Sequence, residues 1–309
     1  MKKKVFIDGS VGTTGLRIYE RLSAREDLEL LTLSEEKRKD PAARKQMLNS
    51  ADVAFLCLPD DAAREAVAMI ENPSVTVIDA STAHRTLEGW AYGFPELSSA
   101  FEEKILSSKR IAVPGCHASG FISLVYPLIE AGLLDKNALI TCHSITGYSG
   151  GGKKMIAEYE SEDKSVLLGA PRQYALSQTH KHLKEMKGIC GLENAPMFSP
   201  IVSNFYSGMA VTVPLFASQV KASVSELKKL YAEKYNGEIV KYVESADENG
   251  FLSGAALSGK DSMHITVAGN DERILLLAVY DNLGKGASGA AIECMNLAIG
   301  ENRTKGLIL

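Results

Sequence analysis

The fold is decided by the stretch Val5-Phe6-Ile7-Asp8-Gly9-Ser10-Val11-Gly12-Thr13-Thr14-Gly15, in which a short apolar strand runs directly into a glycine turn. The glycines are spaced G-x-x-G-x-x-G, and the residues after the turn are typical of a helix. Such glycines let the backbone come close to a pyrophosphate, which the N-terminus of the following helix attracts. A tight strand-to-helix turn needs glycine for steric reasons in any case, so the flanking strand and helix are what favour a dinucleotide site. The predicted cofactor contacts are Gly9, Val11, Gly12, Thr13, Thr14 and Gly15.

Apolar segments in the first third of the chain alternate with helical segments. Strands are expected over residues 5–7, 28–33, 53–58 and 75–78, and the first helix over residues 16–22. Strands that alternate with helices form a parallel sheet with helices on both faces. The N-terminal part is therefore predicted to be an α/β structure, a Rossmann-type doubly wound sheet.

The end of the second predicted strand bears on the kind of dinucleotide. Enzymes that bind NAD place an acidic residue here against the ribose hydroxyls, whereas this chain has Ser34-Glu35-Glu36-Lys37-Arg38. The cations of Lys37 and Arg38 suit a 2′-phosphate, which predicts NADP(H). A solvated, charged helix start is the alternative interpretation. With the loop after the next strand, which is expected to line the nicotinamide side, the predicted cofactor contacts here are Ser34, Lys37, Arg38, Leu58 and Pro59.

Composition excludes several functional classes. The 309 residues suffice for two domains, and the formal charge of −4 comes without a block of lysine or arginine, so no nucleic-acid partner is expected. No apolar run approaches membrane-spanning length, so we expect no membrane association and a cytoplasmic protein. The five cysteines are odd in number, and none are paired at metal-ligand spacing, so neither a disulfide framework nor a metal site is expected.

The pattern changes near residue 117. Segments rich in β-formers are residues 138–146, 210–213, 262–269 and 274–280, and a helix is expected over residues 224–235. This pattern predicts an α+β domain with a mixed or antiparallel sheet. A glycine- and alanine-rich helix from about residue 286 to residue 298 follows. We predict an NADP-binding domain of residues 1–116 and 285–309, and a catalytic and oligomerisation domain of residues 117–284.

Cys116 follows a tight turn, Val113-Pro114-Gly115. Proline fixes φ, glycine accepts torsions that other residues avoid, and residues 121–128 have a helical pattern. The thiol is therefore expected at a helix N-terminus, where the helix dipole favours the thiolate and hence a nucleophile. A small buried residue is the alternative, because free cysteines are commonly buried.

A second cluster is His180-Lys181-His182-Leu183-Lys184-Glu185. If a helix starts here, Glu185 lies on the same face as His182 and can orient its imidazole. Cysteine, histidine and carboxylate then have the roles of nucleophile, base and orienter. His180 is the second candidate for the base, and a solvated polar helix cap is the alternative for the whole cluster. Metal binding by the two histidines lacks further ligands.

Three segments carry the groups that bind anions. Ser81-Thr82-Ala83-His84-Arg85 follows one predicted strand, and Gly147-Tyr148-Ser149-Gly150-Gly151-Gly152-Lys153-Lys154 follows another. Hydroxyls, backbone N–H groups and a cation together bind phosphate or carboxylate, although a glycine run can also be a flexible connector. In the third segment, Asp281-Asn282-Leu283-Gly284-Lys285-Gly286-Ala287, Asn282 can bind an amide such as the nicotinamide carboxamide or be an ordinary helix cap. The predicted substrate contacts are Arg85, Ser149, Gly150, Lys153 and Lys154, and Ser81 and Asn282 join the predicted cofactor contacts.

Together these segments resemble the N-acetyl-γ-glutamyl-phosphate reductase family, in its shorter bacterial form, of the aspartate-semialdehyde dehydrogenase superfamily. The resemblance covers nearly the whole chain and rests on the glycine turn, residues 79–85, Tyr92-Gly93-Phe94-Pro95-Glu96, Pro114-Gly115-Cys116, residues 147–154, the histidine cluster and residues 281–287. The chain departs from its relatives at His117, where tyrosine is frequent, and at Ser119, where threonine is usual.

The resemblance implies the NADPH-dependent reduction of N-acetyl-L-glutamyl 5-phosphate to the 5-semialdehyde, with release of phosphate, in arginine biosynthesis. It implies that Cys116 forms a thioester with the acyl group, that His182, or alternatively His180, is the acid and base, and that Glu185 holds the tautomer. It also implies a homo-oligomer, a dimer or a tetramer. Related acyl-phosphate reductases, acting on aspartyl or carrier-bound aminoadipyl phosphate, are alternatives, and so is an NADP-binding sensor without activity.

Overall fold

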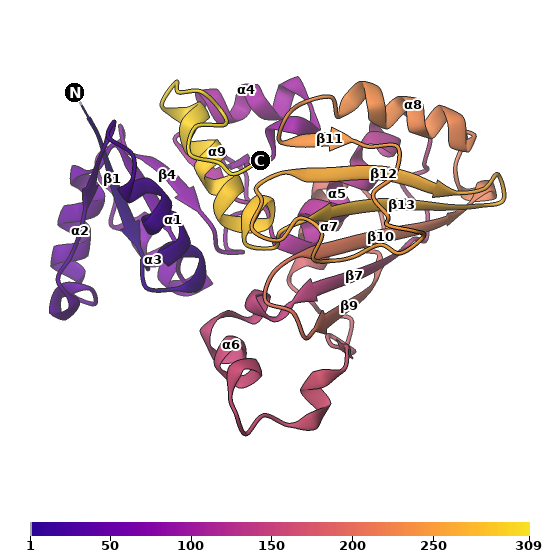
Figure 1. The fold of residues 1–309 in the computed structure, drawn as a ribbon. Coiled ribbons are helices and arrows are strands. Elements are labelled where there is room, and N and C mark those ends of the chain that lie inside the picture. The colour runs from indigo at the N-terminus through magenta and orange to yellow at the C-terminus, as the bar shows by residue number, and fades with distance from the viewer. Residues whose placement is uncertain (1) are drawn as a thin grey trace. The chain divides into compact units, whose positions relative to one another are not determined.

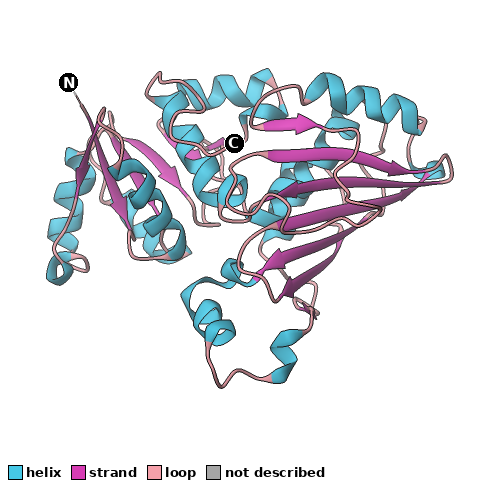
Figure 2. Cartoon of the chain, viewed as in Figure 1, coloured by secondary structure: helices cyan, strands magenta, loops and turns pink. Residues whose placement is uncertain are grey.

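The structure is a computed structural model that describes residues 2–309, and it divides into two compact units (Figure 1). The first unit runs to Pro114 and takes in Ala287–Leu307. The second comprises Gly115–Gly286 with Ile308–Leu309. Helices and strands alternate in the first unit, whereas the second is dominated by one large sheet (Figure 2).

The first unit is built on a six-stranded sheet whose strands are all parallel, in the order β2-β1-β3-β4-β6-β5. The strands are β1 Lys3–Asp8, β2 Leu28–Leu31, β3 Val53–Leu56, β4 Thr76–Asp79, β5 Ala91–Tyr92 and β6 Arg110–Ala112. The helices are α1 Thr13–Ser23, α2 Pro41–Ser50, α3 Asp60–Ala68, α4 Ser99–Ser107 and α9 Gly289–Ala298, with short 3-10 turns at Glu35–Lys37 and Pro95–Leu97.

Helices cover both faces of this sheet. Val5 of β1 packs in one apolar cluster with Ile18 of α1 and Ile292 of α9. Its neighbour Phe6 points to the other face and packs with Leu48 of α2. Because both faces bury apolar side chains, the strands read as short apolar runs rather than alternating ones. The predicted Rossmann-type doubly wound sheet is confirmed.

The second unit contains a seven-stranded mixed sheet in the order β11-β12-β13-β10-β7-β9-β8. The strands are β7 Thr141–Gly147, β8 Arg172–Gln173, β9 Met197–Ser203, β10 Met209–Phe216, β11 Val240–Tyr242, β12 Met263–Gly269 and β13 Arg273–Tyr280. The helices are α5 Cys116–Glu130, α6 Gly152–Glu160, α7 His182–Cys190 and α8 Val224–Lys234, with 3-10 turns η3 Tyr148–Gly151, η4 Val166–Gly169 and η5 Ala217–Gln219. A π-helical turn, Gly284–Ser288, contains the point where the chain returns to the first unit. Parallel pairs β11/β12 and β7/β9 join antiparallel ones, so that of the two predicted alternatives, a mixed or an antiparallel sheet, the sheet is mixed.

The two faces of the seven-stranded sheet differ. Helix α5 packs on β10 and β13, α8 packs on β12, and α7 packs on α5. Along β7 and β13 the side chains alternate, so that Ser144 faces the covered side and Ile145 and Leu275 face the other, where they are 38% and 39% exposed. Phe216, at the end of β10, is also exposed. Part of the second face therefore remains open and apolar.

Candidate active site

Cys116 is the first residue of helix α5, as the sequence predicts, and its thiol is half-buried. The Tyr280 hydroxyl from β13 donates to the Cys116 carbonyl (2.5 Å) and accepts from the Gly120 N–H (3.0 Å), so it is inserted into the first turn of the helix. Gly120 leaves the room for it, since a Cβ there would lie 2.7 Å from the Tyr280 hydroxyl oxygen. The turn that carries the thiol is thus fixed to the sheet.

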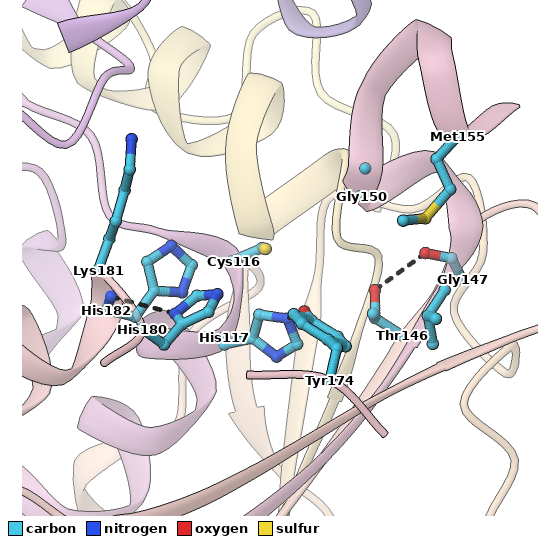
Figure 3. A pocket seen from close by; sticks show the side chains of 12 residues that line it. Cys116, His117, Thr146, Gly147, Gly150, Met155, Tyr174, His180, Lys181 and His182 are labelled. Carbon is cyan, nitrogen blue, oxygen red and sulfur yellow. Dashed lines mark hydrogen bonds between the residues drawn. The ribbon is translucent and has the colours of Figure 1, made fainter. Parts of the chain in front are cut away.

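A cavity of about 260 Å³ within the second unit has Cys116 in its wall (Figure 3). This volume is close to the lower end of small-molecule sites, about 300 Å³, and suits a short acyl chain. In Figure 3 the rings of His180 and His182 lie to one side of the Cys116 sulfur, and Gly150 and Met155 to the other. The lining residues are Cys116, His117, Thr146, Gly147, Gly150, Gly151, Met155, Tyr174, His180, Lys181, His182 and Val202.

The two histidines of the cluster differ in their surroundings. His182 starts helix α7, so the condition for placing Glu185 on its face is met, whereas His180 precedes the helix. His180 Nδ1 accepts a hydrogen bond from the His182 backbone N–H at 3.2 Å, and the ring centroids are 4.7 Å apart. Burial, with the nearby charge of Lys181 as a second cause, lowers the pKa of His180. His180 is therefore neutral near neutral pH and has one ring nitrogen occupied by the helix start.

Glu185 contacts the cysteine turn directly. Its Oε1 accepts a hydrogen bond from the Gly115 backbone N–H at 2.8 Å, and its side chain is buried. This bond ties the first turn of α7 to the residue before Cys116. His182 is also buried in that turn, so the nucleophile candidate and the histidine candidate are held by one packed pair of helices.

His117 bridges two hydroxyl groups in the wall of the cavity. Its Nδ1 lies 2.6 Å from Ser144 Oγ, and its Nε2 lies 2.6 Å from the Tyr174 hydroxyl. Burial, with the charge of His180 as a second cause, lowers the pKa of His117 from 6.5 to about 3. His117 is therefore a neutral imidazole at physiological pH.

Of the predicted anion-binding residues of the second unit, Gly150 lines the cavity, whereas Ser149 and the two lysines do not. Ser149 is buried and accepts from Asn282 Nδ2 at 3.0 Å. Lys153 and Lys154 are exposed on α6, outside the cavity lining. The lysine in the lining is Lys181 instead.

Asn282 is buried, and both ends of its amide are engaged. Its Oδ1 accepts from the Gly208 N–H at 2.9 Å, and its Nδ2 donates to Ser149. The Asn282 side chain does not cap the turn that follows; Asp281 Oδ1 instead accepts from the N–H groups of Leu283 (2.7 Å) and Gly284 (3.3 Å). Asn282 thus links the turn η3 to the start of β10.

Arg85 and Ser81 lie in the first unit and are buried there. The Arg85 guanidinium donates to the carbonyls of Val113 (2.8 Å) and Ala80 (3.1 Å). The Ser81 hydroxyl donates to Asp79 Oδ2 at 2.7 Å. These contacts give both residues a role in the packing of the first unit, beside any role in binding.

The glycine turn of the first unit fits a pyrophosphate. Gly9 has φ +87°, and a Cβ there would lie 2.3 Å from the Cys57 carbonyl oxygen; a Cβ on Gly15 would lie 2.3 Å from the Gly9 carbonyl oxygen. Both glycines are therefore required for the close approach of strand, turn and helix. Gly12 is the N-cap of α1, whose first turn has no acidic residue and no side-chain cap, while Val11 is exposed. Backbone N–H groups at Thr13 and Thr14 belong to that first turn, as an anion site requires.

Further predicted cofactor contacts follow β2 and β3. Lys37 is exposed at the end of the 3-10 turn whose N-cap is Ser34, and Arg38 pairs with Glu35 at 2.5 Å. Leu58 and Pro59 lie between β3 and α3, with Pro59 as the N-cap of α3.

Residues 2–309 contain no cluster of three or more histidine, cysteine, aspartate or glutamate side chains arranged to hold a metal ion. Within the same residues, no helix combines the length and the apolar character needed to cross a membrane. All five cysteines, Cys57, Cys116, Cys142, Cys190 and Cys294, are free thiols. Burial raises the pKa of the Cys57 thiol to about 12, and burial also raises the pKa of Cys142 and of Cys190 above the ordinary value of a thiol.

Two family models match the chain. Residues 4–105 match the NAD binding domain of semialdehyde dehydrogenases, and residues 116–282 match their dimerisation domain. The chain thus has a domain for a nicotinamide dinucleotide and a domain type that forms homo-oligomers.

Similar proteins cover almost the full length. N-acetyl-gamma-glutamyl-phosphate reductase 2 from Nostoc sp. is 44% identical and covers 99% of each chain, and N-acetyl-gamma-glutamyl-phosphate reductase from Chelativorans sp. is 46% identical over 97% of this chain and 99% of its own. Aspartate semialdehyde dehydrogenase II from Vibrio cholerae has the same fold, with a TM-score of 0.74 at 17% identity, covering 97% of this chain and 99% of that one. An aspartate semialdehyde dehydrogenase with NADP from Candida albicans has a TM-score of 0.67 at 15% identity, over 98% and 100%. The chain is therefore an oxidoreductase that belongs to the N-acetyl-γ-glutamyl-phosphate reductase family of semialdehyde dehydrogenases.

Proposed function

We propose that this enzyme reduces N-acetyl-L-glutamyl 5-phosphate with NADPH to N-acetyl-L-glutamate 5-semialdehyde, with release of phosphate, in arginine biosynthesis. The observation that carries the proposal is the position of Cys116: a thiol at a helix N-terminus, in the wall of a cavity that it shares with His180 and His182. The names of the relatives, N-acetyl-gamma-glutamyl-phosphate reductases, support the acyl group.

The first step is acyl transfer to Cys116. The helix dipole of α5 favours the thiolate, which attacks the acyl carbonyl carbon. The bond between that carbon and the phosphate oxygen breaks, the electron pair leaves with inorganic phosphate, and a thioester remains on Cys116. The predicted anion-binding residues, Arg85, Ser149, Gly150, Lys153 and Lys154, are the candidates for holding the phosphate and the carboxylate of the substrate.

The second step converts the thioester to the aldehyde. The glycine turn would hold a nicotinamide dinucleotide, which would supply the hydride that reduces the thioester carbon. The resulting oxyanion on that carbon is stabilised by backbone N–H groups of the first turn of α5, at His117 and Ala118, each contributing about 3 kcal/mol. Collapse of the tetrahedral species breaks the carbon–sulfur bond and releases the aldehyde and the Cys116 thiolate.

His182 is the proposed acid and base. It protonates the oxyanion and takes the same proton back as the carbon–sulfur bond breaks, so that the aldehyde and the Cys116 thiolate are released. Glu185, three residues further along α7, is the proposed orienter of His182, and its bond to Gly115 couples that role to the cysteine turn. His180 is the less favoured base, because its Nδ1 accepts from the His182 backbone.

A substrate panel tests the reaction. The purified enzyme is assayed in the oxidative direction with phosphate, with NADP or NAD, and with the semialdehydes of N-acetylglutamate, aspartate and aminoadipate. N-acetylglutamate semialdehyde with NADP and phosphate is expected to give the highest kcat/KM. A higher kcat/KM with aspartate or aminoadipate semialdehyde would replace the proposed substrate with one of the related acyl phosphates.

We propose NADP(H) as the preferred dinucleotide, held at its 2′-phosphate by Lys37 and Arg38. The other proposed contacts of the dinucleotide are Gly9, Val11, Gly12, Thr13, Thr14, Gly15, Ser34, Leu58, Pro59, Ser81 and Asn282. Changing Lys37→Ala and Arg38→Ala together is expected to raise the Kd of NADP at least about tenfold, because two charge-assisted hydrogen bonds to the phosphate are lost, while the Kd of NAD stays within about threefold. Fluorescence titration with both dinucleotides measures this, with the exposed Lys45→Ala as the control. Equal losses for NADP and NAD would exclude the 2′-phosphate contact.

We propose that the homo-oligomer, a dimer or a pair of dimers, forms through the open face of the seven-stranded sheet. Ile145, Leu275 and Phe216 give this face exposed apolar area that a second copy can bury. Leu275→Lys is expected to halve the mass measured by light scattering at micromolar concentration, because it places a charge in the interface. Leu106→Lys, at an exposed leucine of α4, is the control and should leave the mass unchanged. An unchanged mass for Leu275→Lys would move the interface elsewhere.

We propose that the enzyme works in the cytoplasm. Five free thiols, including one proposed nucleophile, suit a compartment that keeps cysteines reduced.

A further inference from the structure

We propose that Ser144, His117 and Tyr174 form a directed hydrogen-bond chain that presents the Tyr174 hydroxyl as a donor to an oxygen of the acyl substrate bound at Cys116. Tyr174 is then a substrate-binding residue, and His117 and Ser144 are positioning residues that act through it. The identity of the bound oxygen, carbonyl or carboxylate, rests on the proposed function. The direction of the chain rests on its own geometry.

The hydrogen-bond chain begins at Ser144, a buried serine. Ser144 lies on β7 with no exposed area, and its Oγ is 2.6 Å from His117 Nδ1. Across residues 2–309 the Ser144 hydroxyl has no other hydrogen-bond partner. A buried hydroxyl whose proton finds no acceptor is costly. The Ser144 proton is therefore directed to His117 Nδ1, the one acceptor within reach.

The His117 imidazole determines the direction of the next hydrogen bond, to Tyr174. A neutral imidazole has one N–H and one acceptor nitrogen. His117 is neutral, since burial lowers its pKa to about 3. When Nδ1 accepts from Ser144, the ring proton must be on Nε2, from which it is donated to the Tyr174 oxygen at 2.6 Å.

The Tyr174 proton is left for a ligand. The Tyr174 oxygen accepts from His117 Nε2, so its own O–H points away from the ring nitrogen. Within the described residues this hydroxyl has no second partner, and Tyr174 lines the cavity beside Cys116 (Figure 3). Burial and the nearby Cys116 raise the pKa of Tyr174, so the hydroxyl keeps its proton and stays a donor. An acyl phosphate offers several acceptor oxygens to such a donor.

The backbone holds Tyr174 in this position. Its N–H donates to the Pro200 carbonyl at 3.0 Å, which continues the pairing of β8 with β9. The next residue, Ala175, has φ +54°, a conformation that L-residues rarely adopt and that the surrounding structure must impose.

The tautomer of His117 is the first test, and it needs no turnover. Long-range ¹H–¹⁵N spectra of the imidazoles, with His117 assigned by loss of its signals in His117→Asn, are expected to show a neutral ring with its proton on Nε2. They are expected to show no titration of that ring between about pH 5 and pH 8. Only six histidines contribute signals. A proton on Nδ1, or a titration in this range, would overturn the proposed direction.

Kinetics are the second test. Tyr174→Phe is expected to raise the KM for the acyl substrate about tenfold or more while kcat stays within about threefold, since a contact made equally in ground and transition states is lost. Ser144→Ala is expected to raise KM less, and the double variant to match Tyr174→Phe, because Ser144 acts through Tyr174. Tyr242→Phe, on β11, is the control. An unchanged KM with a reduced kcat in Tyr174→Phe would contradict the proposed hydrogen-bond chain. Additive effects on KM in the double variant would contradict it as well.

The two tests separate the two proposals. If the Nε2 tautomer is observed but no semialdehyde is turned over, the proposed hydrogen-bond direction is supported and the proposed reaction is excluded. If turnover is observed and the His117 proton is on Nδ1, the proposed reaction is supported and the proposed hydrogen-bond direction is excluded.

Discussion

Changing Cys116→Ala is expected to lower the phosphate-dependent oxidation of N-acetylglutamate semialdehyde by at least about four orders of magnitude, because no other group can form the thioester. Binding of NADP, measured by fluorescence titration, is expected to remain unchanged, since the glycine turn belongs to the other unit. Cys116→Ser is expected to be almost as inactive, because a hydroxyl at this position is not ionised near neutral pH.

Controls separate loss of the nucleophile from loss of the fold. Cys190→Ala removes a buried thiol of α7 whose pKa is raised well above its usual value by burial, and it is expected to retain turnover. In the wild type, an alkylating reagent should label one thiol rapidly, at Cys116, and preincubation with substrate should slow the labelling. Turnover within about tenfold of wild type in Cys116→Ala would exclude the covalent mechanism.

The parallel sheet could be predicted because its strands are buried on both faces and separated by helices, so that each is a short apolar run between turns. The sheet of the second unit was harder to predict from the sequence. Strands β8 and β11 have two and three residues, too few to show a period of two, and they exist because β9 and β12 provide edges to pair with. Neighbours in space, not local pattern, determine such strands.

The site shows the same limit. The turn before Cys116 follows from local rules on proline, glycine and periodicity. The contact between Glu185 and Gly115 does not follow from such rules. Spacing places Glu185 on the same helix face as His182. Its carboxylate accepts from the N–H of Gly115, 70 residues away in the sequence, because α5 packs on α7. Tyr174 and Tyr280 were missed for this reason, since their partners His117 and Cys116 lie 57 and 164 residues away.

Changing His182→Ala is expected to lower kcat by about two to four orders of magnitude with a smaller effect on KM, because general acid–base catalysis acts on the transition state. The geometry of α7 carries this expectation. His182 is buried in the first turn of the helix whose Glu185 binds the cysteine turn. Rates of the acyl-transfer and hydride steps, followed separately by phosphate release and by dinucleotide absorbance, show which step the imidazole serves.

His180 is the matched control for His182. Its Nδ1 accepts from the His182 N–H, so its contribution is to the start of α7, and burial lowers its pKa and keeps it neutral. His180→Asn retains a side-chain acceptor for that N–H and is expected to keep kcat within about tenfold of wild type. His180→Ala lacks the acceptor and should lower thermal stability more than His180→Asn does. A kcat that collapses in both His180 variants while His182→Ala remains active would assign the acid and base to His180, and the helix-cap contact would then be secondary to catalysis.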